Sequence, residues 1–458
     1  MYKRNIHSLC AVVLALMVAA PTALFAQGQK EEKEAAKTRP VTVKPYGFIR
    51  NYFNYDSRKT YTVVGGEYNM LPYDNKWNED NSEDLNAVPH AQLEALTTRI
   101  GLNLDGPEVL GLHSSGKIEA DFGGFSTNNM VFRIRQAYVK LSKASSVTQL
   151  FKHTANTTSE ILVGQTWHPL SGEIMPEVLG MAAGAPFRPH SRTPQVRVIN
   201  YIDHVGYTVS LLYQLQYMNN GPTSATNSTS TASLDFSRNA IVPEVFLGLN
   251  YKNDYFYTQL GFDFQMLRPR THADVGGITK KVDESVLSMT PTLYAQFVKG
   301  KVAIKMRTLL AENTSHLNQL VGYGVSGINT DGSWDYAPLR ATISYLNLAY
   351  GKTIRGNLFL GYMKNLGAGN DLYNFGTTTA PSYCIYVKGG SDFTNLNSVW
   401  RVSPSISYNI KAFNVGLEYE LTGATYGDLN TNGSINVDND NLHQVLNHRI
   451  CALVKYNF

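Results

Sequence analysis

Apolar and polar residues alternate with a period of two along most of the chain. One face of residues 206–217 carries Tyr207, Val209, Leu211, Tyr213, Leu215 and Tyr217, and the opposite face carries Thr208, Ser210, Gln214 and Gln216. Successive side chains of a β-strand point to opposite sides. Strands of about 10 residues that are apolar outside and polar inside are typical of a membrane β-barrel.

The same alternation recurs in about sixteen segments. They are predicted at 46–56, 91–105, 114–123, 131–141, 160–167, 194–202, 205–217, 241–251, 255–267, 286–298, 301–311, 338–350, 354–366, 398–409, 412–423 and 443–458. Short turns such as KND and KGK take every second connection, and long polar loops take the others. The pattern predicts an all-β fold, a transmembrane antiparallel barrel of about 16 strands with short periplasmic turns and long extracellular loops.

A soluble β-sandwich is the alternative fold, since its strands alternate as well. Tyr and Phe recur here at both ends of the strands, which suits the two interfaces of a membrane better. The final segment ICALVKYNF keeps the alternation up to Phe458, as a closing strand would.

The N-terminal residues 1–26 resemble a signal peptide, with Lys3 and Arg4 before an apolar run. Cleavage is expected after Ala26, and Cys10 lies too early in the run for a lipoprotein anchor. Residues 27–44 are expected to form a charged periplasmic leader, either solvated or forming a short oligomerising helix, and residues 45–458 the barrel. Localisation in the outer membrane of a Gram-negative bacterium follows.

Charge and cysteine content narrow the function. The formal net charge is +4, and about +2 remains without the signal peptide, which is too balanced for nucleic-acid binding. Cys384 and Cys451 are expected to stay unpaired. Histidines are scattered without metal-ligand spacing, and no G-x-S-x-G or phosphate loop occurs. No catalytic residue, metal or cofactor is therefore assigned. An outer-membrane hydrolase is the least favoured alternative.

The segment 168–193 combines apolar and basic residues, which suits a loop that folds into the barrel. Arg188, His190, Arg192 and Arg197 are the candidates for a positive constriction. In the rival interpretation, the carboxylates of Glu173 or Glu177 neutralise these residues and hold the loop shut.

Alternation also assigns side chains to the lumen. The lumen-lining candidates are Arg99, Lys117, Glu119, Asp121, Arg133, Arg135, Lys305, Arg307 and Arg401. Arg133 and Arg135 form either a ladder for anions or ion pairs with Glu119 and Asp121. After Ala137 the alternation places Tyr138 and Lys140 on the lipid face, which indicates a β-bulge or the periplasmic end of the strand.

Five motifs between Arg99 and Val198 carry a family resemblance. TRIGLNLDGPEVLG, GKIEADF, FRIRQAYVKL, ILVGQTWHPL and GAPFRPHSRTPQVRV together resemble the N-terminal half of the DcaP-like trimeric porins of the Bacteroidota. The resemblance implies a homotrimer of barrels that admits small, anionic solutes by diffusion. The long periplasmic coiled coil of larger members is nearly absent here.

These observations together predict an outer-membrane porin for small hydrophilic solutes, with a mild preference for anions or carboxylates. Its expected partners are membrane lipid, lipopolysaccharide and the solutes, with no nucleic acid. A surface scaffold or adhesin with a plugged lumen is the runner-up. The sequence names no solute, and it leaves open whether calcium or lipopolysaccharide bridges the acidic loop NVDNDN.

Overall fold

The computed structural model describes residues 40–66, 68–126, 129–150, 153–171, 175–180, 184–223 and 229–458. The expected signal peptide 1–26 and most of the leader lie outside these ranges.

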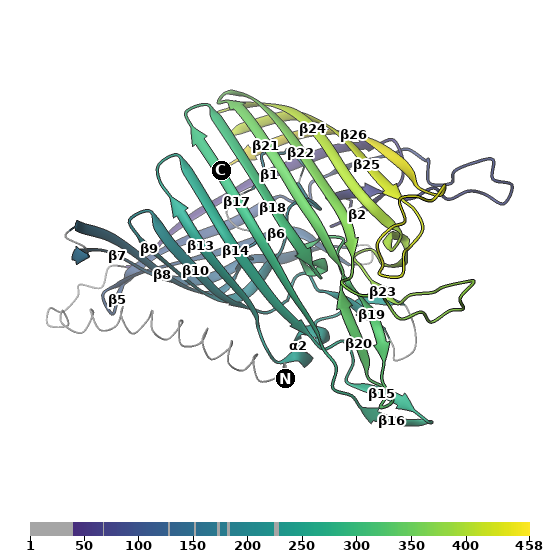
Figure 1. Cartoon of the computed structure of the whole chain (residues 1–458). Coiled ribbons are helices and arrows are strands. Elements are labelled where there is room, and N and C mark those ends of the chain that lie inside the picture. The colour runs from purple at the N-terminus through teal and green to yellow at the C-terminus, as the bar shows by residue number, and fades with distance from the viewer. Residues whose placement is uncertain are drawn as a thin grey trace.

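The chain folds into one closed antiparallel β-barrel (Figure 1). Its strands are β1 (Thr42–Asp56), β4 (His90–Glu94), β5 (Arg99–Val109), β6 (Leu112–Ser126), β7 (Asn129–Leu150), β8 (His153–Trp167), β9 (Arg192–Ile202), β10 (Val205–Leu212), β13 (Glu244–Lys252), β14 (Phe256–Leu267), β17 (Val286–Lys299), β18 (Val302–Glu312), β21 (Arg340–Gly351), β22 (Ile354–Gly367), β24 (Leu396–Ile410), β25 (Phe413–Tyr426) and β26 (His443–Asn457). β4 and β5 share one position because both pair with β1, and β1 also pairs with β26. The barrel therefore has sixteen strand positions, as the alternation predicts.

Some predicted strand ends are wrong. β10 ends at Leu212 instead of continuing to Tyr217, because residues 213–218 leave the ladder. Tyr217 is consequently buried, and its ring lies 6.3 Å from that of His190. β7 and β8 run well past the predicted limits and pair as far as Leu150 and His153.

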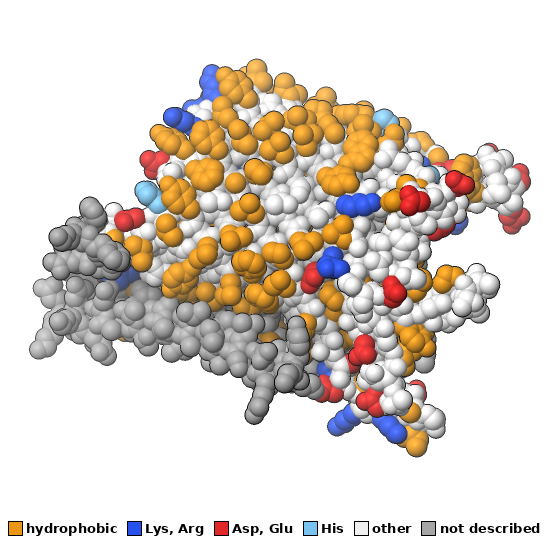
Figure 2. Space-filling model, viewed as in Figure 1, with side chains coloured by type: hydrophobic (Ala, Val, Ile, Leu, Met, Phe, Trp, Pro, Cys, Tyr) orange, Lys and Arg blue, Asp and Glu red, His pale blue; other side chains and the backbone are white. Residues whose placement is uncertain are grey.

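The outer surface carries the apolar half of the alternation. Figure 2 shows hydrophobic side chains gathered over the strands, with charged ones toward the two ends of the barrel. Exposed tyrosines mark the ends beside the short turns, namely Tyr251, Tyr350, Tyr408 and Tyr456. An apolar band bordered by aromatic residues is what a bilayer requires of a barrel exterior. None of the helices in the described ranges is long and apolar enough to cross a membrane.

A β-bulge on β7 explains the change of phase after Ala137. Gln136 pairs with Glu119 and Ile134 pairs with Ala120, so Arg135 is an extra residue in the ladder. An extra residue reverses which side chains face inward. Lys140 accordingly pairs with Glu160, and the sequence-based placement of Lys140 on the lipid face is wrong.

Several extracellular loops fold back into the barrel. The first contains β2 (Thr60–Val63) and β3 (Tyr68–Pro72), and the loop after β18 contains η1 (Ser315–Leu317), β19 (Tyr323–Ile328) and β20 (Trp334–Pro338). Both contribute buried residues to a hydrophobic cluster with the wall strands, including Met70, Leu71, Leu320 and Val321. The remaining small elements are β11 (Asn220–Pro222), β12 (Ser230–Ala232), α2 (Asp235–Ala240), β15 (His272–Val275), β16 (Ile278–Lys281), β23 (Ile385–Tyr386) and η2 (Gly390–Phe393).

The two cysteines of the barrel belong to different parts of the core. Cys384 packs with Tyr323 and Tyr386, whereas Cys451 lies in the cluster around Tyr52. We expect the folded protein to migrate identically with and without reductant on a denaturing gel. A mobility shift on reduction would contradict this prediction.

Candidate functional site

The candidate site lies where the described residues of the third loop, 168–171, 175–180 and 184–191, contact the inner side of the barrel wall. Backbone N–H groups of Leu179 and Gly180 donate to the Glu418 carboxylate on β25, at 2.8 and 3.2 Å. Phe187 packs against β22, where a Cβ in place of the hydrogen of Gly361 would collide with its ring. Hydrogen bonds and close packing thus hold this loop to the wall.

Arg401 on β24 joins two loops to the wall. Its guanidinium donates to the carbonyl oxygen of Ala185 in the third loop at 3.0 Å. It also donates to the carbonyl oxygens of Asn69 and Met70 in the first loop, at 3.0 and 3.1 Å. Because its donors are used in this way, Arg401 is a structural anchor, where alternation had suggested a side chain lining the water path.

Three guanidinium groups converge on Trp167 at the end of β8. The guanidinium carbons of Arg192, Arg188 and Arg135 lie 4.7, 5.4 and 5.8 Å from the indole centroid. The negative face of the indole attracts cations at these distances. Trp167 therefore gathers basic residues from the third loop, β9 and β7 into one cluster.

His190 links the third loop to two other loops. Its Nε2 lies 2.8 Å from the Tyr68 hydroxyl, and its Nδ1 lies 2.9 Å from Arg188 Nη1. Its backbone N–H donates to the Leu317 carbonyl at 2.7 Å. Burial, with the charges of Arg188 and Arg192, lowers the pKa of His190 well below its usual value. The ring is therefore neutral and accepts a hydrogen bond from Arg188.

Arg188, Arg192 and Arg307 carry buried charge without an acidic partner in the described part of the chain. Arg188 and Arg192 are 0% exposed and Arg307 is 2% exposed. No described residue accepts a hydrogen bond from Nη1 or Nη2 of Arg192, or from Nε or Nη1 of Arg307. Burial lowers the pKa of Arg188 to about 10, with Tyr345 opposing the shift and Arg307 adding to it. The group still remains a cation at neutral pH.

Glu177 does not neutralise these arginines. Its carboxylate pairs with Arg355 on β22 and, at 3.3 Å, with Lys305 on β18. Burial opposes ionisation of Glu177, but the hydrogen bond from Arg355 and the charges of Lys305 and Arg355 outweigh it and lower its pKa. The rival interpretation is thus wrong for Glu177, and Glu173 lies outside the described residues.

The carboxylates on β6 pair with the arginines on β7. Arg133 Nε lies 2.7 Å from Asp121, and Arg135 lies 2.9 Å from Glu119 and 2.5 Å from Asp121. Arg99 joins the group 3.6 Å from Glu119. This arrangement is the paired alternative to a free ladder, and the two carboxylates compensate two of the three guanidinium charges.

The other two candidates have local partners. Arg197 donates to Gln195 Oε1 at 2.9 Å and to the Trp167 carbonyl. Lys117 lies over the ring of Tyr46, with Nζ 5.2 Å from the centroid. Alternation therefore identified residues that face inward. Burial and the lack of a described acidic partner distinguish Arg188, Arg192 and Arg307 from the other candidates.

Sequence reasoning missed residues that reach the lumen from loops. Tyr68 and Leu317 contact His190 from segments that no local pattern connects to it. It also missed a group of histidine and carboxylate side chains, described below, which comes from four separate segments.

Comparisons with known proteins bear on the fold. No family model matches the chain, and no curated relative does either. Among solved structures, the outer membrane channel DcaP of Acinetobacter baumannii is similar, with a TM-score of 0.59 and 15% identity over 92% of this chain and 98% of that one. An anion-selective porin from Comamonas acidovorans has a TM-score of 0.48 and 9% identity over 91% and 100% of the two chains. OmpT of Vibrio cholerae has a TM-score of 0.47 and 11% identity over 93% and 100%.

At these identities the likeness shows the fold alone, and the two lower TM-scores carry no argument. The closed sixteen-strand barrel and its apolar exterior define an outer-membrane β-barrel protein. Its architecture is that of the outer-membrane porins.

Proposed function

We propose that this chain is a homotrimeric, DcaP-like porin that admits small hydrophilic solutes by passive diffusion and prefers anions such as carboxylates. The observation that carries the proposal is the buried positive charge of Arg188, Arg192 and Arg307, to which the described residues offer no carboxylate within ion-pair distance. Burying an unpaired charge is costly. A site that keeps several such charges is suited to a passing anion that compensates them.

Selection would rest on pore width and fixed charge. The third loop narrows the lumen, and the arginines beside Trp167 create a positive potential at that level. A positive constriction lowers the electrostatic barrier for anions and raises it for cations. The motif resemblance between Arg99 and Val198 supports the trimer and the porin class, and the apolar exterior suits contacts with lipid and lipopolysaccharide.

A surface scaffold with a plugged lumen is the second candidate, and one observation favours it. Side chains of the first and third loops, such as Tyr68, Leu170 and Phe187, are 0% exposed. Water therefore does not reach these side chains. In a porin these loops must move, or leave a path beside them, whereas in a scaffold they stay packed.

Planar-bilayer recording of the purified protein separates the two. We expect stepwise current and, under a potassium chloride gradient, a reversal potential with the sign of chloride permeation. A correctly folded barrel that produces no steps would contradict the porin and favour the scaffold. A reversal potential of the opposite sign would contradict the anion preference.

A further inference from the structure

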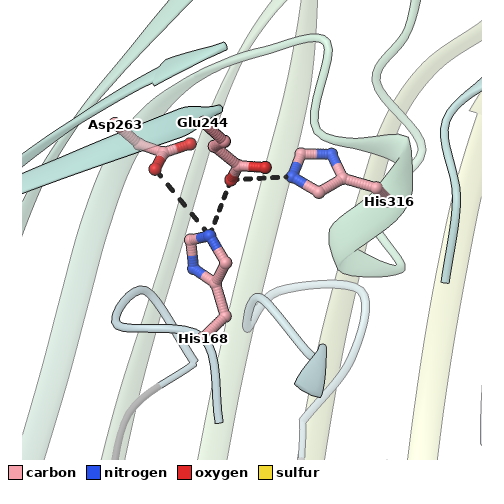
Figure 3. Close-up of side chains that lie close together, drawn as sticks. All are labelled: His168, Glu244, Asp263 and His316. Carbon is pink, nitrogen blue, oxygen red and sulfur yellow. Dashed lines mark hydrogen bonds and ion pairs between the residues drawn. The ribbon is translucent and has the colours of Figure 1, made fainter. Parts of the chain in front are cut away.

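Four ligand-type side chains meet inside the barrel near its extracellular end (Figure 3). Glu244 begins β13 and Asp263 lies on the adjacent strand β14, while His168 follows β8 and His316 lies in η1 after β18. One ligand atom from each lies within 4.8 Å of all the others. Figure 3 shows both imidazole rings directed toward the two carboxylates.

The charge balance of this cluster calls for a cation. Within 4.0 Å, the described residues give Glu244 only the two imidazoles as basic partners, at 2.6 Å from His168 and 3.1 Å from His316. Asp263 has only His168, at 3.8 Å. All four side chains are at most 5% exposed. Two carboxylates removed from water are stabilised by protonation or by nearby positive charge, and a single divalent ion would balance both.

The Oδ1 atom of Asp263 gives independent evidence for a ligand between these side chains. This oxygen is buried and accepts no hydrogen bond from any described residue. This atom is directed into the cluster, toward Nε2 of His168. A buried carboxylate oxygen normally has a partner, and a bound metal ion would provide one.

We propose that His168, Glu244, Asp263 and His316 bind a divalent transition-metal ion, with zinc as the reference metal. Two imidazoles and two carboxylates form a ligand set that zinc accepts in four-coordinate sites. Gln265, which lies 3.2 Å from His316 Nδ1 and 3.4 Å from Glu244 Oε2, supplies an outer contact of the kind that orients ligands.

Metal binding requires a small rearrangement of the hydrogen-bonded form. The N–H of Leu170 donates to Nδ1 of His168 at 3.1 Å, so Nε2 carries the proton that Glu244 accepts. Coordination through Nε2 moves this proton to Nδ1, which then no longer accepts from the Leu170 N–H, so that contact opens. Ligand atoms around a tetrahedral zinc lie about 3.3 Å apart. His168 and Glu244, now 2.6 Å apart, must therefore separate, and His168 and Asp263, now 3.8 Å apart, must approach each other. Protons compete with the metal for the imidazole and carboxylate ligands, so metal affinity rises with pH.

The ion would act as a clamp between loops and wall. His168 begins the third loop and His316 belongs to the loop after β18, whereas both carboxylates are on the wall. Bound metal would join both loops to β13 and β14, and its ligand His168 is next in the chain to Trp167 of the arginine cluster. The inference concerns metal binding and does not depend on the proposed porin function.

The test uses the full-length folded barrel in detergent, stripped with a chelator and titrated with zinc or cobalt. Bound metal is measured by mass spectrometry, and cobalt is also followed by its visible absorption. We expect one ion per chain for the natural sequence and at least about a 100-fold loss of affinity in His168→Gln and Asp263→Asn. Glutamine keeps an N–H donor for Glu244, so a simple hydrogen-bonded network would tolerate it.

His204→Gln at a short periplasmic turn is the matched control, because His204 is exposed and outside the cluster. It should bind metal as the natural sequence does. A folded barrel that binds less than one tenth of an equivalent, or equal losses in control and cluster variants, would overturn the site. Recording conductance on the same preparation keeps the two proposals separate, since a chain that conducts without binding metal contradicts only the metal site.

Discussion

Replacing Arg188 and Arg192 together by glutamine should lower the ratio of anion to cation permeability on the order of tenfold. Two unit charges 4 Å apart attract by about 4 kcal/mol at an effective dielectric constant near 20, and about 1.4 kcal/mol suffices for a tenfold change. Both side chains lack an acidic partner in the described ranges, so no carboxylate there cancels their charge, which acts on an ion in the lumen through the surrounding protein. The measurement is the reversal potential under a salt gradient.

The control removes the same charge outside the lumen. Lys352→Gln at a periplasmic turn and Arg238→Gln on α2 change exposed residues. This double variant should keep the selectivity of the natural sequence. An equal loss in both double variants would mean that net charge of the whole protein sets the selectivity, and an unchanged ratio in the first would remove these arginines from the constriction.

Arg401→Ala should have the largest effect on stability. It deletes the donors to Ala185, Asn69 and Met70 and leaves Glu420, 3.9 Å away, with less compensation of its buried charge. Breaking a buried charged network typically costs about 3–5 kcal/mol. We expect a decrease of that size in the free energy of unfolding, measured with urea in lipid or detergent, and a larger single-channel conductance because both loops lose their anchor.

Lys352→Ala is the matched control for Arg401→Ala, since an exposed turn residue should change the free energy of unfolding by less than about 0.5 kcal/mol. A decrease below about 1 kcal/mol in Arg401→Ala, with unchanged conductance, would show that the loops are held without Arg401. A loss of stability without a change in conductance would show that the loops do not limit the pore.

Local pattern was enough to predict the barrel. Period-two alternation and the alternating lengths of connections define sixteen strand positions, and the structure has the same number. Errors arose where the chain leaves the ladder. The alternation runs to Tyr217 in sequence, but β10 ends at Leu212 and Tyr217 is buried, and the extra residue at Arg135 reverses the phase of β7. Alternation counts residues, whereas pairing with the neighbouring strand decides which ones are in register.

The candidate site was predictable only in part. Alternation and the basic loop indicated Arg188, Arg192 and Arg307 as inward-facing residues. Alternation indicated Arg401 and Arg135 equally. The distinction lies in their partners. Arg401 donates to backbone carbonyls of two loops and Arg135 pairs with Glu119 and Asp121. Partners of this kind come from segments far apart in the chain, so no local pattern reveals them.

The sequence by itself determined the class of fold, because a lipid-facing exterior and a polar interior impose their period on every strand. Only the tertiary structure decided which charges are compensated and which are not. It also brought His168 and His316, from two loops far apart in the chain, to Glu244 and Asp263 on the neighbouring strands β13 and β14. The physical reason is that strand periodicity is a local property, whereas ion pairing, burial and metal ligation depend on how the loops fold back into the closed barrel.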